Sequence, residues 1–392
     1  MKKTKLTKTT ISMNYEKPFI AGNLTTIKFL VIIGQDGIKK GGCIKIGTPN
    51  MGWGQPFCST PRDWSELLEG KSFIHNSWKP INTTYKLKSR LKSDIQLRGD
   101  ENQITDVTFS KITQDAEFVE IDRSKKFKFK NPPMKESFID KYGQWRWWIT
   151  ATVVKENLVE GDVIEIVYGD TGNSNGIKIQ PWFEDKLDFC ALADFSHTSK
   201  FIELSGSPIN IKVEKNIGSQ IHAVIPTIIH PTENQKIKLS ILDKNFLPPK
   251  NNFTGSINFY SKTNIQIDSN KIVKNILVSK IKTNYNDIHR IEVTANNFDK
   301  IITNPGVSSE DNDLNIYWGD LHAQSKYHQW KIEINRGDSC NSPKGLHEYA
   351  RDYSLLDFVT ITDGFGAYDY NPGWQETQKV VNEMYQPGKY EH

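Results

Sequence analysis

Cysteine is scarce in this sequence. The 392 residues include only four, Cys43, Cys58, Cys190 and Cys340. They are far apart, and no two form the Cys-x-x-Cys pair that is typical of zinc knuckles and redox motifs. We therefore expect neither a zinc knuckle nor a disulfide framework, but free thiols that are mostly buried.

A long apolar run is also missing. No window approaches the roughly 18 apolar residues that would span a bilayer, and "KFLVIIG", which ends at Gly34, has the length of a strand. The N-terminus "MKKTKLTKTTISMNYEKPF" has the basic start of a secretory signal without the apolar segment that would follow it. The sequence thus predicts no membrane partner and a cytoplasmic location.

Charge of one sign is not in excess. The chain has 50 Lys and Arg against 46 Asp and Glu, a net charge of +4, so nothing in the composition favours nucleic acid as a partner. With 37% hydrophobic and 24% charged residues the sequence is typical of a soluble globular protein. Its length predicts two or three domains of roughly 100 to 200 residues each.

Residues 1–215 have the pattern of an N-terminal β-sandwich region. Short alternating runs are separated by clusters of Gly, Asn, Asp and Pro. In "GDVIEIVYGD" both sets of alternate side chains are largely apolar, as in a strand that is covered on both faces. "SPINIKVEK" repeats the period of two with Ile209, Ile211 and Val213.

A second β domain is predicted over residues 216–303. "KIKLSILD" alternates Ile237, Leu239 and Ile241, and the strand spacing in fewer than 100 residues suits an Ig-like sandwich. Pro, Gly, Ser and acidic residues then follow without periodicity in "ITNPGVSSEDND". We interpret residues 304–313 as a linker.

The pattern changes at residues 314–392. "LNIYWGDLHAQS" is predicted to be a strand, and "SPKGLHEYARDYS" a helix with Ser342 as its N-cap and Pro343 at its first position. "LDFVTITDG" is a second strand. Strand, helix and strand predict a βαβ unit of a parallel α/β domain.

Four polar residues follow the ends of these two strands. Asp320, His322 and Gln324 alternate, so they would project from one face, and Asp363 would reach the same edge from the second strand. Carboxyl ends of parallel strands are where α/β domains gather their ligands. One imidazole, two carboxylates and one amide are therefore expected to lie close together.

These stretches carry a resemblance to a known family. "YWGDLHAQS" and "EYARDYSLLDFVTITDG" resemble the start of the catalytic domain in a domain-of-unknown-function family related to the PHP (polymerase and histidinol phosphatase) metallohydrolases. "AGNLTTIKFLVIIGQDGIKKGGCIKI" and the loop at Gly169 and Asp170 are similar to the β-rich region that precedes that domain. The resemblance implies a mainly β chain followed by the first βαβ unit of a PHP-like α/β barrel, truncated at His392. It also implies metal-dependent hydrolysis, typically of phosphoesters.

The resemblance assigns metal ligands residue by residue. His322 matches the first histidine of a His-x-His motif, and Gln324 stands in the place of the second. Thr-Asp-Gly at 362–364 replaces the usual Thr-Asp-His, so a ligand histidine is missing. Zinc, manganese or iron needs at least three ligands and prefers imidazole or carboxylate to an amide, whereas His322 and Asp363 are only two. We expect Asp320 to support a ligand or cap a turn. The chain is thus predicted to be an incomplete hydrolase, inactive as given, with a divalent metal bound weakly or not at all.

A function of another class stays open. "YGQWRWWIT" contains three tryptophans, and alternation predicts that Trp145, Trp147 and Ile149 share one strand face. Such a face is most often core, but an exposed one could stack on a sugar. In that alternative the β domains form a non-catalytic protein that binds a carbohydrate or surface ligand, and the C-terminal unit is a remnant. In the hydrolase alternative the partner is a small-molecule or glycan substrate whose identity the sequence does not indicate.

Overall fold

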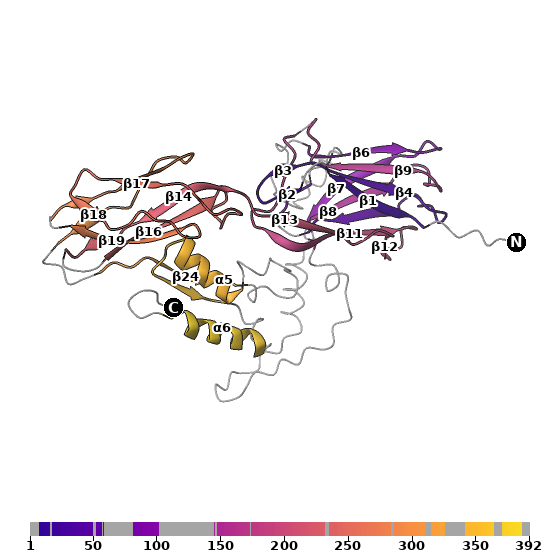
Figure 1. Cartoon of the computed structure of the whole chain (residues 1–392). Helices are drawn as coiled ribbons and strands as arrows, with labels where there is room; N and C mark the ends of the chain where they lie inside the picture. The colour runs from indigo at the N-terminus through magenta and orange to yellow at the C-terminus, as the bar shows by residue number, and fades with distance from the viewer. Residues whose placement is uncertain are drawn as a thin grey trace, which may run out of the picture.

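A computed structural model describes residues 8–15, 18–49, 52–56, 58, 81–101, 145, 147–172, 174–231, 235–283, 286–309, 315–325, 342–363 and 371–385. Over these residues the chain is mostly β structure, in two groups of sheets followed by a small unit that contains helices (Figure 1). The mainly β class predicted from the sequence is confirmed. Within the described ranges no helix is both long enough and apolar enough to cross a membrane.

The first group of sheets is a sandwich built from the N-terminal region. One sheet has the antiparallel order β1 (Thr10–Tyr15), β4 (Ile27–Ile32), β9 (Val163–Tyr168) and β6 (Thr83–Lys88). The other has the order β2 (Phe19–Ile20), β13 (Ile209–Glu214), β11 (Glu184–Asp194), β5 (Cys43–Gly47), β8 (Trp147–Val153) and β7 (Ile95–Glu101), with β12 (Ile202–Glu203) paired to β11. A short pair is formed by β3 (Leu24–Thr25) and β10 (Ile177–Lys178).

The core of the first sandwich lies between its two large sheets. In β4 the alternate residues Ile27, Phe29 and Val31 are buried, while the residues between them are exposed. Phe29 meets Phe189 of β11 edge to face, with ring centroids 5.2 Å apart. Alternation in the sequence thus becomes one apolar face for each sheet, and the two faces pack together.

The turn after β9 explains the Gly-Asp pair of the sequence. Gly169 has φ +85°, and a Cβ there would clash with the carbonyl oxygen of Thr25. The Asp170 carboxylate accepts hydrogen bonds from Gly172 N at 2.9 Å and Thr84 Oγ1 at 2.8 Å. These contacts close a tight turn against β6.

The second group of sheets forms another sandwich. Its main sheet has the order β14 (Gly218–Val224), β16 (Gln235–Asp243), β19 (Ile276–Thr283) and β18 (Ile265–Ile267). Opposite lie β17 (Ile257–Tyr260), β21 (Glu292–Ala295) and β22 (Ile301–Ile302), and a third sheet joins β15 (Ile228–Ile229), β23 (Gly306–Ser308) and β20 (Ile288–His289). The buried cluster includes Ile237, Leu239 and Ile241, the alternating residues of the sequence pattern.

One strand of this sandwich lies inside the segment predicted as a linker. β23 pairs in parallel with β15 and antiparallel with β20, and Ser308 Oγ lies 3.0 Å from Nε2 of the buried His289. A strand of three residues shows no periodicity of its own, so the sequence pattern indicated only loop residues. The second sandwich therefore extends beyond residue 303, and the predicted 304–313 linker does not begin there.

The loop after β16 belongs to the second sandwich and contacts the first sandwich. Asp243 is buried and accepts hydrogen bonds from Asn245 N and Leu247 N, which shapes the loop. Asn245 Nδ2 then donates to the carbonyl of Ala21 at 3.2 Å, and Lys244 Nζ donates to Asn23 Oδ1 at 2.7 Å. These hydrogen bonds connect the two sandwiches.

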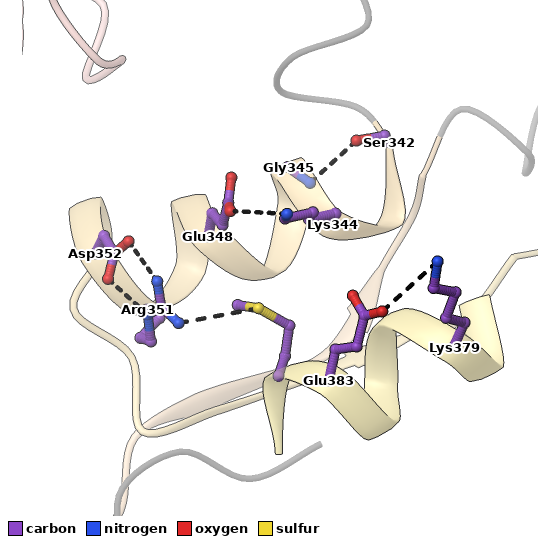
Figure 2. Close-up of polar contacts among 9 residues, drawn as sticks. Ser342, Lys344, Gly345, Glu348, Arg351, Asp352, Lys379 and Glu383 are labelled. Atoms are coloured by element: carbon purple, nitrogen blue, oxygen red, sulfur yellow. Dashed lines mark hydrogen bonds and ion pairs between the residues drawn. The ribbon is translucent and has the colours of Figure 1, made fainter. Parts of the chain in front are cut away.

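The C-terminal unit combines two parallel strands with helices. It contains β24 (Gly319–Ala323), α5 (Pro343–Glu348), the π-helix η2 (Tyr349–Tyr353), β25 (Phe358–Ile361) and α6 (Asn371–Met384). The predicted helix start is confirmed, because the Ser342 side chain caps Gly345 N at 3.0 Å (Figure 2). Figure 2 also shows Arg351 bound to Asp352. Arg351 Nη1 lies 3.9 Å from Met384 Sδ, so η2 and α6 are in contact.

The C-terminal unit packs on the main sheet of the second sandwich (Figure 1). The carbonyl of Tyr353, at the end of η2, accepts from Ser240 Oγ of β16 at 2.8 Å and contacts His222 Nδ1 of β14 at 3.2 Å. Tyr349 donates its hydroxyl to the carbonyl of Phe246 at 2.6 Å. Donors from the sandwich thus bind the carbonyl at the end of this helix.

Candidate functional site

The two C-terminal strands run in parallel, so their carboxyl ends lie at the same edge. β24 and β25 pair from Gly319 with Phe358 to Ala323 with Ile361. Beyond these ends, Thr362 N donates to the carbonyl of Ala323 at 2.8 Å, which keeps the chains together. The candidate residues therefore come from neighbouring strands, as the sequence pattern predicted.

β24 is not a regular strand where the candidate residues lie. Asp320 pairs with Val359 and Ala323 with Ile361, so two residues of β24 oppose the single Thr360 of β25. This two-to-one count is a β-bulge, a feature that is rare in parallel pairs and frequent beside functional sites. The bulge breaks the strict alternation that the sequence pattern assumed for Asp320, His322 and Gln324.

Asp320, His322 and Gln324 nevertheless lie near one another, and all three are exposed. Asp320 Oδ1 accepts a hydrogen bond from His322 N at 2.8 Å, which satisfies a backbone amide inside the bulge. Gln324 Nε2 lies 3.4 Å from His322 Nε2. Asp320 therefore holds the backbone of the candidate ligand, while the His322 ring faces solvent beside the amide.

Asp363 is placed differently. Its side chain is only 8% exposed, and both oxygens accept hydrogen bonds from Ser325, from the backbone N at 2.7 Å and from Oγ at 2.5 Å. A carboxylate oxygen has two acceptor sites, so these bonds do not saturate Asp363. They do fix its position, and Asp363 ties the residues after β24 to those after β25.

The side chains are of types that bind a divalent metal, but too few of them lie together among the described residues. Within the described part of the chain no three His, Cys, Asp or Glu side chains are grouped closely enough to hold a metal ion. His347, another histidine of this unit, is buried in α5. Gly364, the position where a histidine was expected, lies outside the described residues.

The tryptophans of the alternative site are mainly core. Trp145 and Trp148 are 6% and 2% exposed and meet edge to face at 6.2 Å, in a cluster with Cys190 and Leu192. β8 begins at Trp147, and Ile149 points into the main core, so Trp145 packs on the face opposite to Ile149. The predicted common face of Trp145, Trp147 and Ile149 is therefore wrong, because Trp145 precedes the strand and does not follow its alternation.

Asp188 completes the tryptophan cluster. Burial raises the pKa of its carboxyl group, and the hydrogen bond from Trp145 Nε1 at 3.1 Å opposes this only in part. The buried indole N–H of Trp145 already has a protein acceptor, so it is less available to bind a sugar hydroxyl. Trp147, which is half-buried, is the tryptophan of this group with accessible surface.

The residues that sequence reasoning missed are the ones that hold the strands. Asp357 precedes β25, and its Oδ2 accepts from Trp318 N at 3.0 Å, while its Oδ1 lies 2.9 Å from Lys238 Nζ of β16. Trp318 Nε1 also donates to Thr227 Oγ1 at 2.9 Å. The signal in the sequence is an Asp at each end of "DFVTITD", of which only the second, Asp363, was predicted to be a site residue.

Comparisons with known proteins are limited. No protein-family model matches the chain, and no curated protein matches it at a significant level. Similar solved structures include domains 4 and 5 of the S-layer protein SbsC, with 14% identity, a TM-score of 0.20 and coverage of 30% of this chain and 64% of that one. The pilus backbone RrgB from Streptococcus pneumoniae has 7% identity and a TM-score of 0.22, with coverage of 83% of this chain and 63% of that one. This chain thus spans less than two thirds of either structure, and TM-scores this low carry no argument about fold or function.

Proposed function

We propose that the C-terminal unit is one wall of a metal-dependent hydrolase site of the phosphoesterase type, mounted on the second sandwich. The observation that supports this proposal is the parallel pairing of β24 and β25, which brings His322 and Asp363 to the same strand edge. The strand, helix and strand order agrees with the resemblance to PHP metallohydrolases.

His322 is the residue that would hold the metal. Its ring is exposed, and its backbone amide is held by Asp320. Asp363 would contribute through acceptor sites that Ser325 leaves open, and Gln324 through its amide oxygen. A bound divalent ion would act as a Lewis acid on a phosphoryl oxygen and make water a stronger nucleophile. This chain would contribute one imidazole to such a site, and weak metal binding follows from that donor set.

The experiment is a calorimetric titration of the 392-residue chain with Zn²⁺ and Mn²⁺. We expect weak binding at one site, and its loss in His322→Ala. The matched control is His197→Asn, a histidine of the first sandwich with φ +57°, where Asn tolerates the same backbone conformation. Heat signals that are equal in wild type and His322→Ala would contradict the proposal.

A phosphoesterase assay with an aryl phosphate tests the incompleteness of the site. We expect no enzymatic turnover, because Asp320 and His322 face solvent instead of a dry, shaped cavity. Turnover that is lost in His322→Ala would support the hydrolase class and contradict the view that the site is incomplete.

The alternative binding function has less support. A glycan platform needs an exposed ring, and Trp145 and Trp148 are packed against each other. The second sandwich supports the unit that carries the candidate site.

A further inference from the structure

An aspartate stands at each end of β25, and each holds the strand beside it. Before the strand, Asp357 accepts from Trp318 N, and Asp357 N donates to the carbonyl of Trp318 at 2.7 Å. After the strand, Asp363 accepts from Ser325 N and Ser325 Oγ. We call the contacts between Asp357 and Trp318 the lower clamp. The contacts between Asp363 and Ser325 are the upper clamp.

The two strands have different numbers of residues between the lower clamp and the upper clamp. Trp318 and Ser325 are seven positions apart, whereas Asp357 and Asp363 are six apart. The residues of two paired strands advance together, so the extra residue of β24 must leave the ladder. It does so at Leu321 and His322, which together oppose Thr360.

The bulge decides how His322 is presented. Its amide has left the ladder and donates to Asp320 Oδ1, and its neighbour Leu321 is 70% exposed. The candidate ligand thus lies in the bulge, where β24 departs from the ladder. A regular strand would place His322 on the same face as Asp320, with both residues kept in the ladder.

The lower clamp also connects the strands to the second sandwich. Asp357 bridges Lys238 of β16 and the backbone of Trp318, and the Trp318 indole is bound to Thr227. The Lys238 and Asp357 side chains are 23% and 30% exposed, so water screens this pair only partly. The start of β24 is therefore fixed relative to the sandwich, not only to β25.

We propose that Asp357 and Asp363 are positioning residues that keep β24 one residue longer than its partner and so present His322 on a bulge. The inference rests on the proposed function only in naming His322 as the metal ligand. The bulge and its cause do not require a metal, so they can be tested separately. In this view Asp363 acts through Ser325 and not chiefly as a ligand.

The first test is the double variant Asp357→Ala/Asp363→Ala, compared with Asp352→Ala as a matched control in η2. Asp352 is bound to Arg351 (Figure 2). Its two hydrogen bonds to Arg351 involve no residue of either clamp. We expect amide hydrogen exchange in 319–325 to become faster by about tenfold or more in the double variant, because each clamp joins a charged acceptor to a backbone N–H, which is exposed at Trp318 and buried at Ser325. Unchanged exchange there, with the bulge register retained in a crystal structure, would overturn the proposal.

The second test deletes Leu321, which makes the two clamped lengths equal. We expect β24 to pair without a bulge, with exchange protection at least as great as in wild type, while the His322 ring moves and its binding of Zn²⁺ is lost although the imidazole remains. Loss of the β24–β25 pairing in this variant would show that the clamps do not set the length of β24. If wild type binds no Zn²⁺, the proposed function fails, but the exchange data and the register still decide the role of the clamps.

Discussion

The first sandwich and the C-terminal unit are stabilised in different ways. The first sandwich buries a large apolar cluster between two sheets, with aromatic rings such as Phe29, Phe189 and Trp53 in contact. The buried cluster of the C-terminal unit contains Ala350 and Val359, with three half-buried neighbours. Apolar burial scales with area, so the sandwich can fold on its own core, whereas the C-terminal unit depends on polar contacts at its edges.

Truncation of one core residue in each region should give the largest difference. We expect Phe189→Ala to lower the free energy of unfolding of the first sandwich by about 3–5 kcal/mol. Val359→Ala should cost no more than about 2 kcal/mol and act only on the C-terminal unit. Urea unfolding followed by hydrogen exchange of each region checks this. Equal losses of unfolding free energy in both regions would contradict the view that the two regions are stabilised in different ways.

The end of the second sandwich gives the next largest effect. A chain that ends at Ser309 should keep the stability of this sandwich, whereas one that ends at Ile302 should lose about 2–4 kcal/mol. The shorter chain lacks β23, the Ser308 contact with His289, and the Asn304 side chain that bonds both backbone groups of Ile225. Calorimetric unfolding of the two chains measures the difference. The same unfolding transition in both chains would support the linker boundary at residue 304 that the sequence predicted.

The bridge between the C-terminal unit and its support should have a smaller effect. Lys238→Met keeps the apolar stem and removes the charge that faces Asp357. We expect a loss of about 1 kcal/mol in the C-terminal unit and little change in the sandwich. Limited proteolysis of the segment before β24 should become faster. Lys236→Met, an exposed lysine two residues away on the same strand, serves as the control.

Two buried aspartates give the smallest and most specific contrast, since they should respond to pH in opposite directions. Burial raises the pKa of Asp194, but hydrogen bonds from the backbone of Thr198, Ser196 and Ser199 outweigh it, and the pKa is lowered overall. Burial also raises the pKa of Asp243, and there the bonds from the backbone of Leu247 and Asn245 do not offset it.

The signs follow from these directions. The contribution of Asp194 is present above its unfolded pKa of about 4 and is lost as pH falls through the lowered folded pKa. The penalty from Asp243 is absent below pH about 4 and grows as pH rises through its raised folded pKa. Urea midpoints between pH 2.5 and 6 for Asp194→Asn and Asp243→Asn should therefore change the pH slope in opposite senses. The same sense in both variants would contradict this assignment.

The features that the sequence predicted are those that depend on local pattern. The alternation of Ile237, Leu239 and Ile241 and the Ser342 cap each depend on a few neighbouring residues, and the structure shows both. The two strands that carry His322 and Asp363 were predicted from the strand, helix and strand order of the sequence, and they pair in parallel.

The features that the sequence did not predict depend on distant partners. β23 is a strand only because β15 and β20 lie on either side of it. The bulge depends on two aspartates about 40 residues after β24, and the place of Trp145 depends on Trp148 and Asp188. No window of sequence contains such pairs, so local periodicity cannot indicate them.

The most direct test of the central claim is to follow the ring resonances of His322 by NMR while the chain is titrated with Zn²⁺. We predict that the His322 ring shifts, with weak affinity, while the rings of His197 and His230 do not. The shift should be absent after deletion of Leu321, which keeps the imidazole but removes the bulge. An unchanged His322 ring at saturating Zn²⁺ would contradict the proposal that β24 carries a metal ligand.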